Sequence, residues 1–208
     1  HGHTFPGACV PNGLVQLSPD TRPDGYNDWD GCGGYHASDS LIYGFSHTHL
    51  SGTGVADLCD VLLMPMSGTH SFDPKNYRSR FSHKNEQAHA GSYSVHLADH
   101  GIDVELTATQ RAGVHRYQFP ADRDAWLILD LEHRDALVDH QITVVGNDVI
   151  QGMRRSRSWA GDQRLFFVIE FSRPFKQNRL EPYLTKVGDV VSHRPTKGAF
   201  QFAPSKEP

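Results

Sequence analysis

Long apolar runs, a basic surface and a cysteine framework are all missing from this 208-residue sequence. Its longest apolar stretches, such as residues 125–129 and 165–169, fall far short of the ~20 residues that cross a bilayer. Lys and Arg number 20 against 24 Asp and Glu, so clustered positive charge for nucleic-acid phosphates is not indicated. We therefore expect no membrane span and no nucleic-acid partner.

Cysteine is scarce, and its spacing excludes two kinds of small scaffold. The three cysteines, Cys9, Cys32 and Cys59, lie in the first third, and no two of them form a CxxC pair. An odd number without metal-ligand spacing disfavours both a disulfide-knit domain and a zinc ribbon. We expect three buried free thiols, with one disulfide plus one free thiol as the alternative.

A sustained helical period is also missing, whereas the two-residue period of β-strands is plain. From Ile102 to Thr109, apolar residues alternate with polar ones, which predicts a half-buried strand. Similar strand candidates fill the rest of the chain: residues 92–97, 115–119, 126–131, 141–145, 149–151, 165–171 and 199–202. Short strands with turn signals between them predict an all-β fold, a sandwich or barrel. We expect one domain over residues 1–208, without a boundary at 68–78.

The first third has a different composition. Eleven of the 19 glycines fall in residues 1–68, and five of the 14 histidines fall in residues 1–49. Short apolar pieces alternate there with long polar loops. Long ordered loops usually carry function.

One loop, Asp28–His36 (DWDGCGGYH), combines an aromatic ring with acidic side chains and glycines. Carbohydrate sites use this combination, because a ring stacks on a pyranose face while carboxylates hold its hydroxyls. Glycine also lets backbone amides approach a ligand closely. The alternative is a tight loop in which Trp29 has a structural role and covers the edge of a sheet.

A second loop carries the pair His47 and His49. On a strand, side chains two residues apart point to the same face, so this pair has a spacing that suits two ligands of one metal ion. His1 and His3 have the same spacing. A metal site would need a third ligand, for which Asp57, Asp60 or His36 are candidates. The alternative is that these histidines hydrogen-bond to loops or face a polar pocket.

Acid–base chemistry needs paired carboxylates, and here no spacing identifies a pair. The acidic residues of the first third are all aspartates: Asp20, Asp24, Asp28, Asp30, Asp39, Asp57 and Asp60. No G-x-S-x-G nucleophile motif is present. His133, Arg134 and the basic run Arg154–Arg157 are expected on solvated strand ends.

Five segments together resemble the amino-terminal region of glycoside hydrolase family 92, a family of exo-acting α-mannosidases. They are residues 1–8 (HGHTFPGA), 13–22 (GLVQLSPDTR), 29–36 (WDGCGGYH), 43–54 (YGFSHTHLSGTG) and 60–65 (DVLLMP). Weaker similarity follows at residues 116–120 (RYQFP) and 172–175 (SRPF). The resemblance implies a large antiparallel β-sandwich, or supersandwich, with long functional loops.

The resemblance also implies what lies outside this chain. In the family the sandwich packs on a carboxy-terminal (α/α)6 barrel that holds the catalytic acid and base and most ligands of a catalytic calcium. The barrel motif has no match here, so we expect no catalytic residue, metal ligand or cofactor in this chain, and no turnover by the chain alone. Family members are commonly secreted, periplasmic or surface-attached bacterial enzymes. No basic-then-apolar leader opens the sequence, so a signal peptide is expected to be absent or already removed.

The function that the resemblance implies is hydrolysis of terminal mannose, α-1,2-linked, with inversion, and mannose-containing glycans are the expected ligands. Residues placed by motif position in the substrate pocket or at the domain interface are Arg22, Trp29, Asp30, His36, His47 and His49. Two alternatives are a stand-alone carbohydrate-binding sandwich that uses Trp29, and a metalloprotein that uses the His47–His49 pair.

Overall fold

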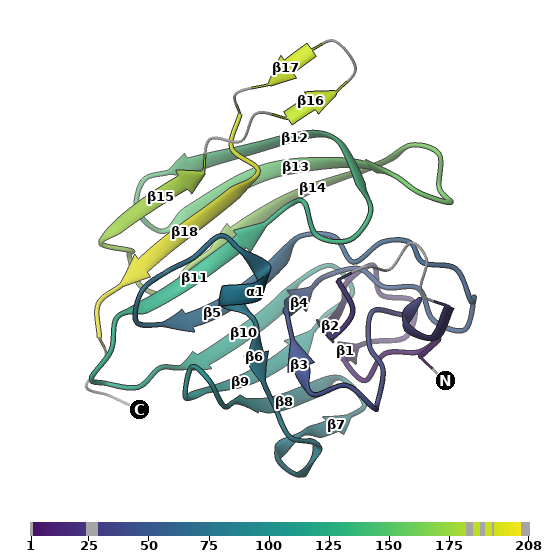
Figure 1. The fold of residues 1–208 in the computed structure, drawn as a ribbon, viewed down its shortest axis with the longest axis horizontal. Helices are drawn as coiled ribbons and strands as arrows, with labels where there is room; N and C mark the ends of the chain where they lie inside the picture. Colours follow the sequence, from purple (N-terminus) through teal and green to yellow (C-terminus); the bar gives the residue numbers. More distant parts are fainter. Residues whose placement is uncertain (1, 24–28, 182–184, 188–189, 193, 205–208) are drawn as a thin grey trace.

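A seven-stranded antiparallel sheet forms the centre of the molecule (Figure 1). The computed structural model describes residues 2–23, 29–181, 185–187, 190–192 and 194–204. In spatial order the central strands are β1 (Ala8–Cys9), β2 (Gln16–Asp20), β4 (Gly44–Ser46), β5 (Leu62–Ser67), β11 (Ala125–Asp130), β18 (Lys197–Phe202) and β15 (Gln177–Glu181). Strands from both ends of the chain thus share one sheet.

Two further sheets accompany the central one (Figure 1). The four-stranded sheet has the order β10 (Gly113–Gln118), β9 (Ile102–Ala108), β8 (Ser92–Leu97) and β7 (Gln87–His89). The three-stranded sheet consists of β12 (Ala136–Val145), β13 (Val149–Arg157) and β14 (Gln163–Glu170).

Among the described residues, the smaller elements are two strand pairs and three short helical segments. They are β3 (Leu41–Ile42) with β6 (Ser79–Arg80), β16 (Thr185–Val187) with β17 (Val190–Ser192), α1 (Pro74–Tyr77), and the 3-10 turns η2 (Trp29–Gly31) and η3 (His83–Asn85).

The central strands bury both faces, because alternate side chains enter two different hydrophobic clusters. Met64 and Ile128 join the cluster that packs against β8 and β9, together with residues such as Val104. Leu63 and Leu129 join the cluster on the opposite face, which includes residues of β12, β13 and β14. Burial on both faces explains why β11 reads as a continuous apolar run rather than an alternating one.

The prediction of an all-β antiparallel sandwich is confirmed. Strand β9 shows the expected alternation of buried and exposed residues. The predicted turn at residues 146–148 joins Val145 to Val149, and Gly146 there adopts a φ of 62°, which glycine reaches without strain. Strands β12 and β13 extend further from this turn than predicted, to Ala136 and Arg157.

The expectation of three free thiols is confirmed, but the expectation that all three are buried is wrong for Cys9. Cys32 and Cys59 are buried, whereas Cys9 is only partly covered. Among the described residues, none of the helices has the length and the apolar sequence that a membrane span requires.

Candidate functional site

An exposed aromatic ring and an acidic side chain stand together on the short turn η2. The side chain of Trp29 is 68% exposed, and its ring meets His3 edge-on with 4.7 Å between ring centroids. Asp30 beside it is also exposed. The guanidinium of Arg134 fixes this turn by donating to the carbonyls of Gly31, at 2.6 Å, and Cys32, at 2.9 Å. The turn is therefore held in place while Trp29 faces solvent.

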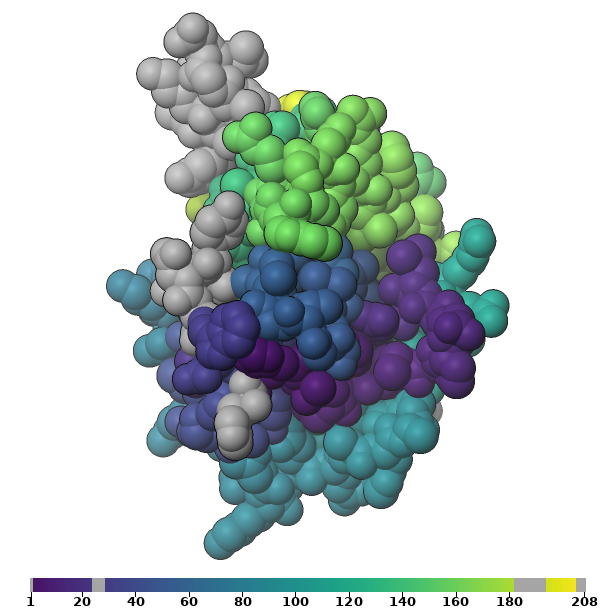
Figure 2. Space-filling model, turned by 90° about the vertical axis from the view of Figure 1, so that its right-hand side faces the viewer, coloured from purple at the N-terminus to yellow at the C-terminus, as the bar shows by residue number. Residues whose placement is uncertain are grey.

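The loop of residues 51–57 lies between this turn and the hairpin that joins β13 to β14 (Figure 2). A Cβ atom added to Gly54 would lie 2.8 Å from the Trp29 ring. On the other side, Ser158 Oγ donates to the carbonyl of Ala56 at 2.9 Å. We refer to residues 29–36, 51–57 and 158–160 as the loop surface.

The loop surface carries a second tryptophan that the sequence reasoning missed. Trp159, at the tip of the β13–β14 hairpin, is 76% exposed. The next residue anchors the tip, because the backbone amide of Ala160 donates to Asp57 Oδ2 at 2.8 Å. A large aromatic residue inside a turn-forming sequence, Ser158–Asp162, is the signal that points to it.

Two other predicted pocket residues lie close to η2. Arg22 Nε donates to Asp39 Oδ2 at 2.5 Å, and the hydroxyl of Thr21 donates to the same oxygen at 2.8 Å. His36 is partly buried, with Nδ1 at 2.7 Å from Ser38 Oγ. Their assignment to a substrate pocket, like that of Trp29 and Asp30, stays a prediction.

His47 belongs to a neutral hydrogen-bonded chain between two sheets. Its Nδ1 lies 2.7 Å from the carbonyl of Val61, and its Nε2 lies 3.0 Å from Nε2 of His115. Nδ1 of His115 lies 2.7 Å from the hydroxyl of Tyr117. Burial lowers the pKa of His47 to about 4 and that of His115 well below its ordinary value.

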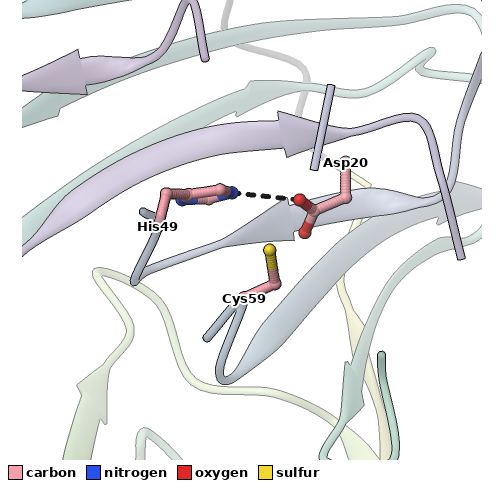
Figure 3. A group of neighbouring side chains, drawn as sticks. All are labelled: Asp20, His49 and Cys59. Carbon is pink, nitrogen blue, oxygen red and sulfur yellow. Dashed lines mark hydrogen bonds and ion pairs between the residues drawn. The ribbon is translucent and has the colours of Figure 1, made fainter. Parts of the chain in front are cut away.

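His49 enters a different cluster, formed with Asp20 and Cys59 (Figure 3). Its Nδ1 lies 2.6 Å from the carbonyl of Gln16, and its Nε2 lies 3.0 Å from Asp20 Oδ1. The other Asp20 oxygen lies 3.2 Å from Nε2 of His133. The two imidazoles of the His47–His49 motif therefore have separate partners rather than a shared ligand set.

The charges of this cluster follow from its contacts. Burial alone would raise the pKa of Asp20, but the His49 charge and the two histidine contacts hold it well below its ordinary range. Burial alone would lower the pKa of His49, but the Cys59 sulfur and the Asp20 carboxylate raise it to about 10. Burial raises the pKa of Cys59, so at neutral pH a thiol lies beside the imidazolium–aspartate pair. At that pH the Asp20 carboxylate supplies the negative charge that keeps His49 protonated.

The prediction that the basic residues lie on solvated strand ends is wrong for Arg154. Its guanidinium is buried and pairs with the carboxylates of Asp60 and Asp135. Its Nε also donates to the carbonyl of Leu131 at 2.8 Å. Consecutive residues of a strand face opposite sides, so Arg154 points inward while Arg155 faces the solvent side.

The same prediction is wrong for His133 and Arg134. His133 is only 7% exposed and lies against Asp20, and Arg134 reaches the carbonyls of η2. Arg157, at the end of β13, is exposed as predicted.

The backbone between these two charged clusters is strained. Leu58, Cys59 and Val61 have φ values of 71°, 61° and 57°, in the left-handed region that side chains with a Cβ disfavour. Cys59 turns toward Asp20, while the next residue, Asp60, turns toward Arg154. Such strain costs roughly 1–3 kcal/mol per residue, so the surrounding contacts must offset it.

The fold and the loop surface define the chain as an antiparallel β-sandwich with exposed aromatic and acidic side chains on its connecting loops. The family model described as "Glycosyl hydrolase family 92 N-terminal domain" matches residues 1–208. The chain therefore belongs to this family, as the sequence resemblance indicated.

Similar proteins are several times longer than this chain. The family GH92 α-mannosidase BT3965 of Bacteroides thetaiotaomicron, solved also with mannoimidazole, is 29% identical with a TM-score of 0.86; the match covers 98% of this chain and 29% of that protein. The inverting mannosidase BT2199 of the same organism is 25% identical with a TM-score of 0.77, covering 100% and 27%. An "uncharacterized secreted glycosidase" of Arthroderma benhamiae is 29% identical, covering 57% of this chain and 16% of that protein.

Proposed function

We propose that the chain is the amino-terminal domain of an exo-α-mannosidase that removes terminal α-1,2-linked mannose with inversion. The whole-chain family match carries this proposal, supported by the α-mannosidase and inverting-mannosidase activities named for similar structures. The chain spans less than a third of those proteins. The proposed enzyme therefore includes a carboxy-terminal catalytic domain, the (α/α)6 barrel that the resemblance implies.

The contribution of this chain is recognition of the sugar. Trp29 offers a flat apolar face on which a pyranose can stack, and Asp30 offers an exposed acceptor for hydroxyl groups. Arg22, whose Nε donates to Asp39, would orient a sugar hydroxyl or the neighbouring loop. His36, His47 and His49 are proposed as pocket or interdomain residues. For the last two, the contacts favour an indirect role, since both imidazoles already bond to protein groups.

The reacting carboxylates are proposed to lie outside this chain. Inverting hydrolysis needs a protonated acid on the leaving oxygen and a carboxylate base on water, ~6.5–9.5 Å apart. The buried aspartates already have protein partners: Asp20 contacts two histidines, and Asp60 and Asp135 pair with Arg154. Asp57 accepts from the amide of Ala160, and Asp130 accepts from the hydroxyl of Tyr77. The chain alone should therefore bind but not hydrolyse mannosides.

Calcium is proposed for the complete enzyme but does not fit the donor set found here. Calcium prefers six to eight oxygen ligands. Among the described residues, the cluster of potential ligands consists of Asp20, His49 and Cys59, which offer one carboxylate with nitrogen and sulfur. The calcium ligands are accordingly expected in the catalytic domain.

The test compares the chain with the complete protein on α-1,2-mannobiose. We expect no turnover by the chain, turnover by the complete protein, and β-mannose as the first product anomer in proton NMR. Trp29→Ala in the complete protein should lower kcat/KM by ~10–100-fold, since loss of an aromatic stacking contact costs about 1–3 kcal/mol. Phe166→Ala, an exposed aromatic in the middle of β14, is the matched control and should leave kcat/KM unchanged.

Three results would contradict parts of this proposal. Turnover by the chain alone would place the catalytic carboxylates here, and α-mannose as first product would exclude inversion. A complete protein without mannosidase activity, combined with Trp29-dependent mannose binding by the chain, would favour the stand-alone carbohydrate-binding function.

We also propose that the protein is secreted, periplasmic or attached to the bacterial cell surface. The name of the related secreted glycosidase supports an extracytoplasmic location. Fractionation of the source cells checks it, and recovery of the protein only from the cytoplasm would contradict it.

A further inference from the structure

Three metal-ligating atoms of different chemistry converge in the buried cluster beneath the loop surface. A carboxylate oxygen of Asp20, a ring nitrogen of His49 and the sulfur of Cys59 all lie within 4.8 Å of one another (Figure 3). The three side chains come from β2, from the segment after β4 and from the strained segment of residues 58–61. All three residues are at most 1% exposed.

The cluster contains polar atoms whose hydrogen-bonding capacity is not met. Asp20 Oδ2 and His133 Nε2 lie 3.2 Å apart, but their alignment does not form a hydrogen bond, and neither has another partner among the described residues. Both side chains are more than nine-tenths buried. Unpartnered buried groups are rare in folded proteins, because each costs about 1–3 kcal/mol.

The orientation of His49 is that of a metal ligand. Nδ1 lies 2.6 Å from the carbonyl of Gln16, and this contact requires its proton. Nε2 then faces Asp20 Oδ1 at 3.0 Å, with the hydroxyl of Ser46 at 3.1 Å. In the metal-free protein a proton on Nε2 makes the contact with the carboxylate, and a metal ion can take the place of that proton. Metal-bound histidines commonly donate their other N–H to a carbonyl in this way.

A proton on Nε2 satisfies only part of the cluster. It pairs His49 with Asp20 Oδ1 but leaves Cys59 as an uncharged thiol. An ion of the zinc class accepts the carboxylate, the imidazole and the thiolate together, and the two anionic ligands balance its charge. The backbone also closes over the cluster, since a Cβ on Gly34 would lie 2.5 Å from Asp20 Oδ1 and 3.1 Å from Cys59 Sγ.

We propose that Asp20, His49 and Cys59 bind one divalent transition-metal ion of the zinc class. Sulfur and imidazole donors select such an ion over calcium or magnesium. His133 acts as a positioning residue that orients the Asp20 carboxylate through Oδ2. On binding, the ion replaces the proton on His49 Nε2 and the thiol proton of Cys59; both protons leave to solvent, and nothing is oxidised or reduced.

The ion would stabilise the base of the loop surface. It would connect β2 to the strained segment of residues 58–61, directly before Asp60 enters the cluster of Arg154. Metal binding would thereby offset the backbone strain of this segment. This inference does not depend on the proposed mannosidase function.

The experiment measures metal content and cobalt spectroscopy of the purified chain. After incubation with Zn²⁺ and gel filtration, we expect about one Zn²⁺ per chain by elemental analysis. Replacement by Co²⁺ should produce a sulfur-to-cobalt charge-transfer absorption in the near ultraviolet. Cys59→Ala should abolish this absorption and weaken Co²⁺ binding by more than the ~10–100-fold that loss of an outer partner costs.

Matched variants separate binding from folding. Cys32→Ala removes the other buried thiol, outside the cluster, and should keep both the Zn²⁺ and the absorption. His133→Gln should keep the absorption but weaken Co²⁺ binding ~10–100-fold. Circular dichroism of each variant shows whether it is folded, and Zn²⁺ should raise the melting temperature of the unsubstituted chain but not of a folded Cys59→Ala variant. Absence of retained Zn²⁺, or an absorption that persists in Cys59→Ala, would overturn the proposal.

Discussion

His47 and His49 are two residues apart, yet they lie in buried surroundings of opposite character. His47 belongs to an uncharged chain with His115 and Tyr117. His49 lies in a charged cluster with Asp20. The comparison shows that the chemistry of a histidine pair is decided by the acceptors each ring meets, and not by the spacing of the pair.

The difference follows from counting protons. Along the His47 chain, Nδ1–H of His47 donates to the Val61 carbonyl, His115 donates to His47 Nε2, and the Tyr117 hydroxyl donates to His115. Every link is satisfied with neutral rings. His49 instead lies between a carbonyl and a carboxylate, which can only accept, and the Ser46 hydroxyl beside Nε2 can accept as well. In the metal-free protein its ring therefore carries two protons, in line with its raised pKa.

The largest effect is expected from removing the charge that stabilises His49. Asp20→Asn should lower the free energy of unfolding of the metal-free protein by about 3 kcal/mol, because it leaves a buried imidazolium without its counterion. This loss of stability is at the low end of the ~3–5 kcal/mol that breaking a buried ion pair costs, because His49 can release its proton and become neutral. Urea unfolding measures it.

An exposed histidine–aspartate pair provides the control for this substitution. His96 Nδ1 and Asp103 Oδ1 lie 2.6 Å apart on the solvent side of β8 and β9. Asp103→Asn should change the free energy of unfolding by at most about 1 kcal/mol. Equal losses for the two substitutions would show that burial does not distinguish the pairs.

The pH dependence should have opposite signs at the two histidines. The pKa of His49 is raised to about 10, above the ordinary value of 6.5, so its contribution to stability is complete below pH 6.5 and is lost as the pH rises toward 10. The pKa of His47 is lowered to about 4, so its contribution is present above pH 6.5 and is lost as the pH falls toward 4.

Imidazole NMR on the metal-free protein separates these contributions. The His49 ring, facing Asp20 and Cys59, should stay protonated through neutral pH. The His47 ring, facing Val61 and His115, should stay neutral down to about pH 4. A shared midpoint near pH 6.5 would mean that the two environments are equivalent.

The smallest effect is expected in the neutral chain. Tyr117→Phe removes the hydroxyl that donates to His115 Nδ1 and should lower the free energy of unfolding by about 1 kcal/mol, the net value of one neutral hydrogen bond. The titration of His49 should not move. A loss as large as that of Asp20→Asn would show that the neutral chain is as important to stability as the ion pair.

The local pattern of apolar, polar and turn-forming residues was sufficient to predict much of the fold. The alternation in Ile102–Ala108 predicted β9, and the tripeptide at 146–148 predicted the β12–β13 turn, because both depend on neighbouring residues alone. Extending the predicted strand at Val149 would have placed Arg154 on the buried side with Ile150. The strand was predicted too short because Arg154–Arg157 reads as a solvated run.

Less of the candidate site could be predicted from local sequence pattern. The sequence indicated the loop of Trp29, but the second exposed tryptophan of the loop surface, Trp159, lies 130 positions later in the chain. Both belong to one surface because the β13–β14 hairpin hydrogen-bonds to the loop of residues 51–57. The hydrophobic periodicity of the sequence does not predict that contact between the hairpin and the loop.

The sequence by itself determined the all-β class and membership of the family, because strand periods and ordered motifs are properties of the linear chain. Only the tertiary structure decided which charges are buried and with whom. Asp20, His49, Cys59 and His133 are brought together across more than 100 residues. Their protonation depends on burial and on facing groups, and both arise only when the separate segments pack.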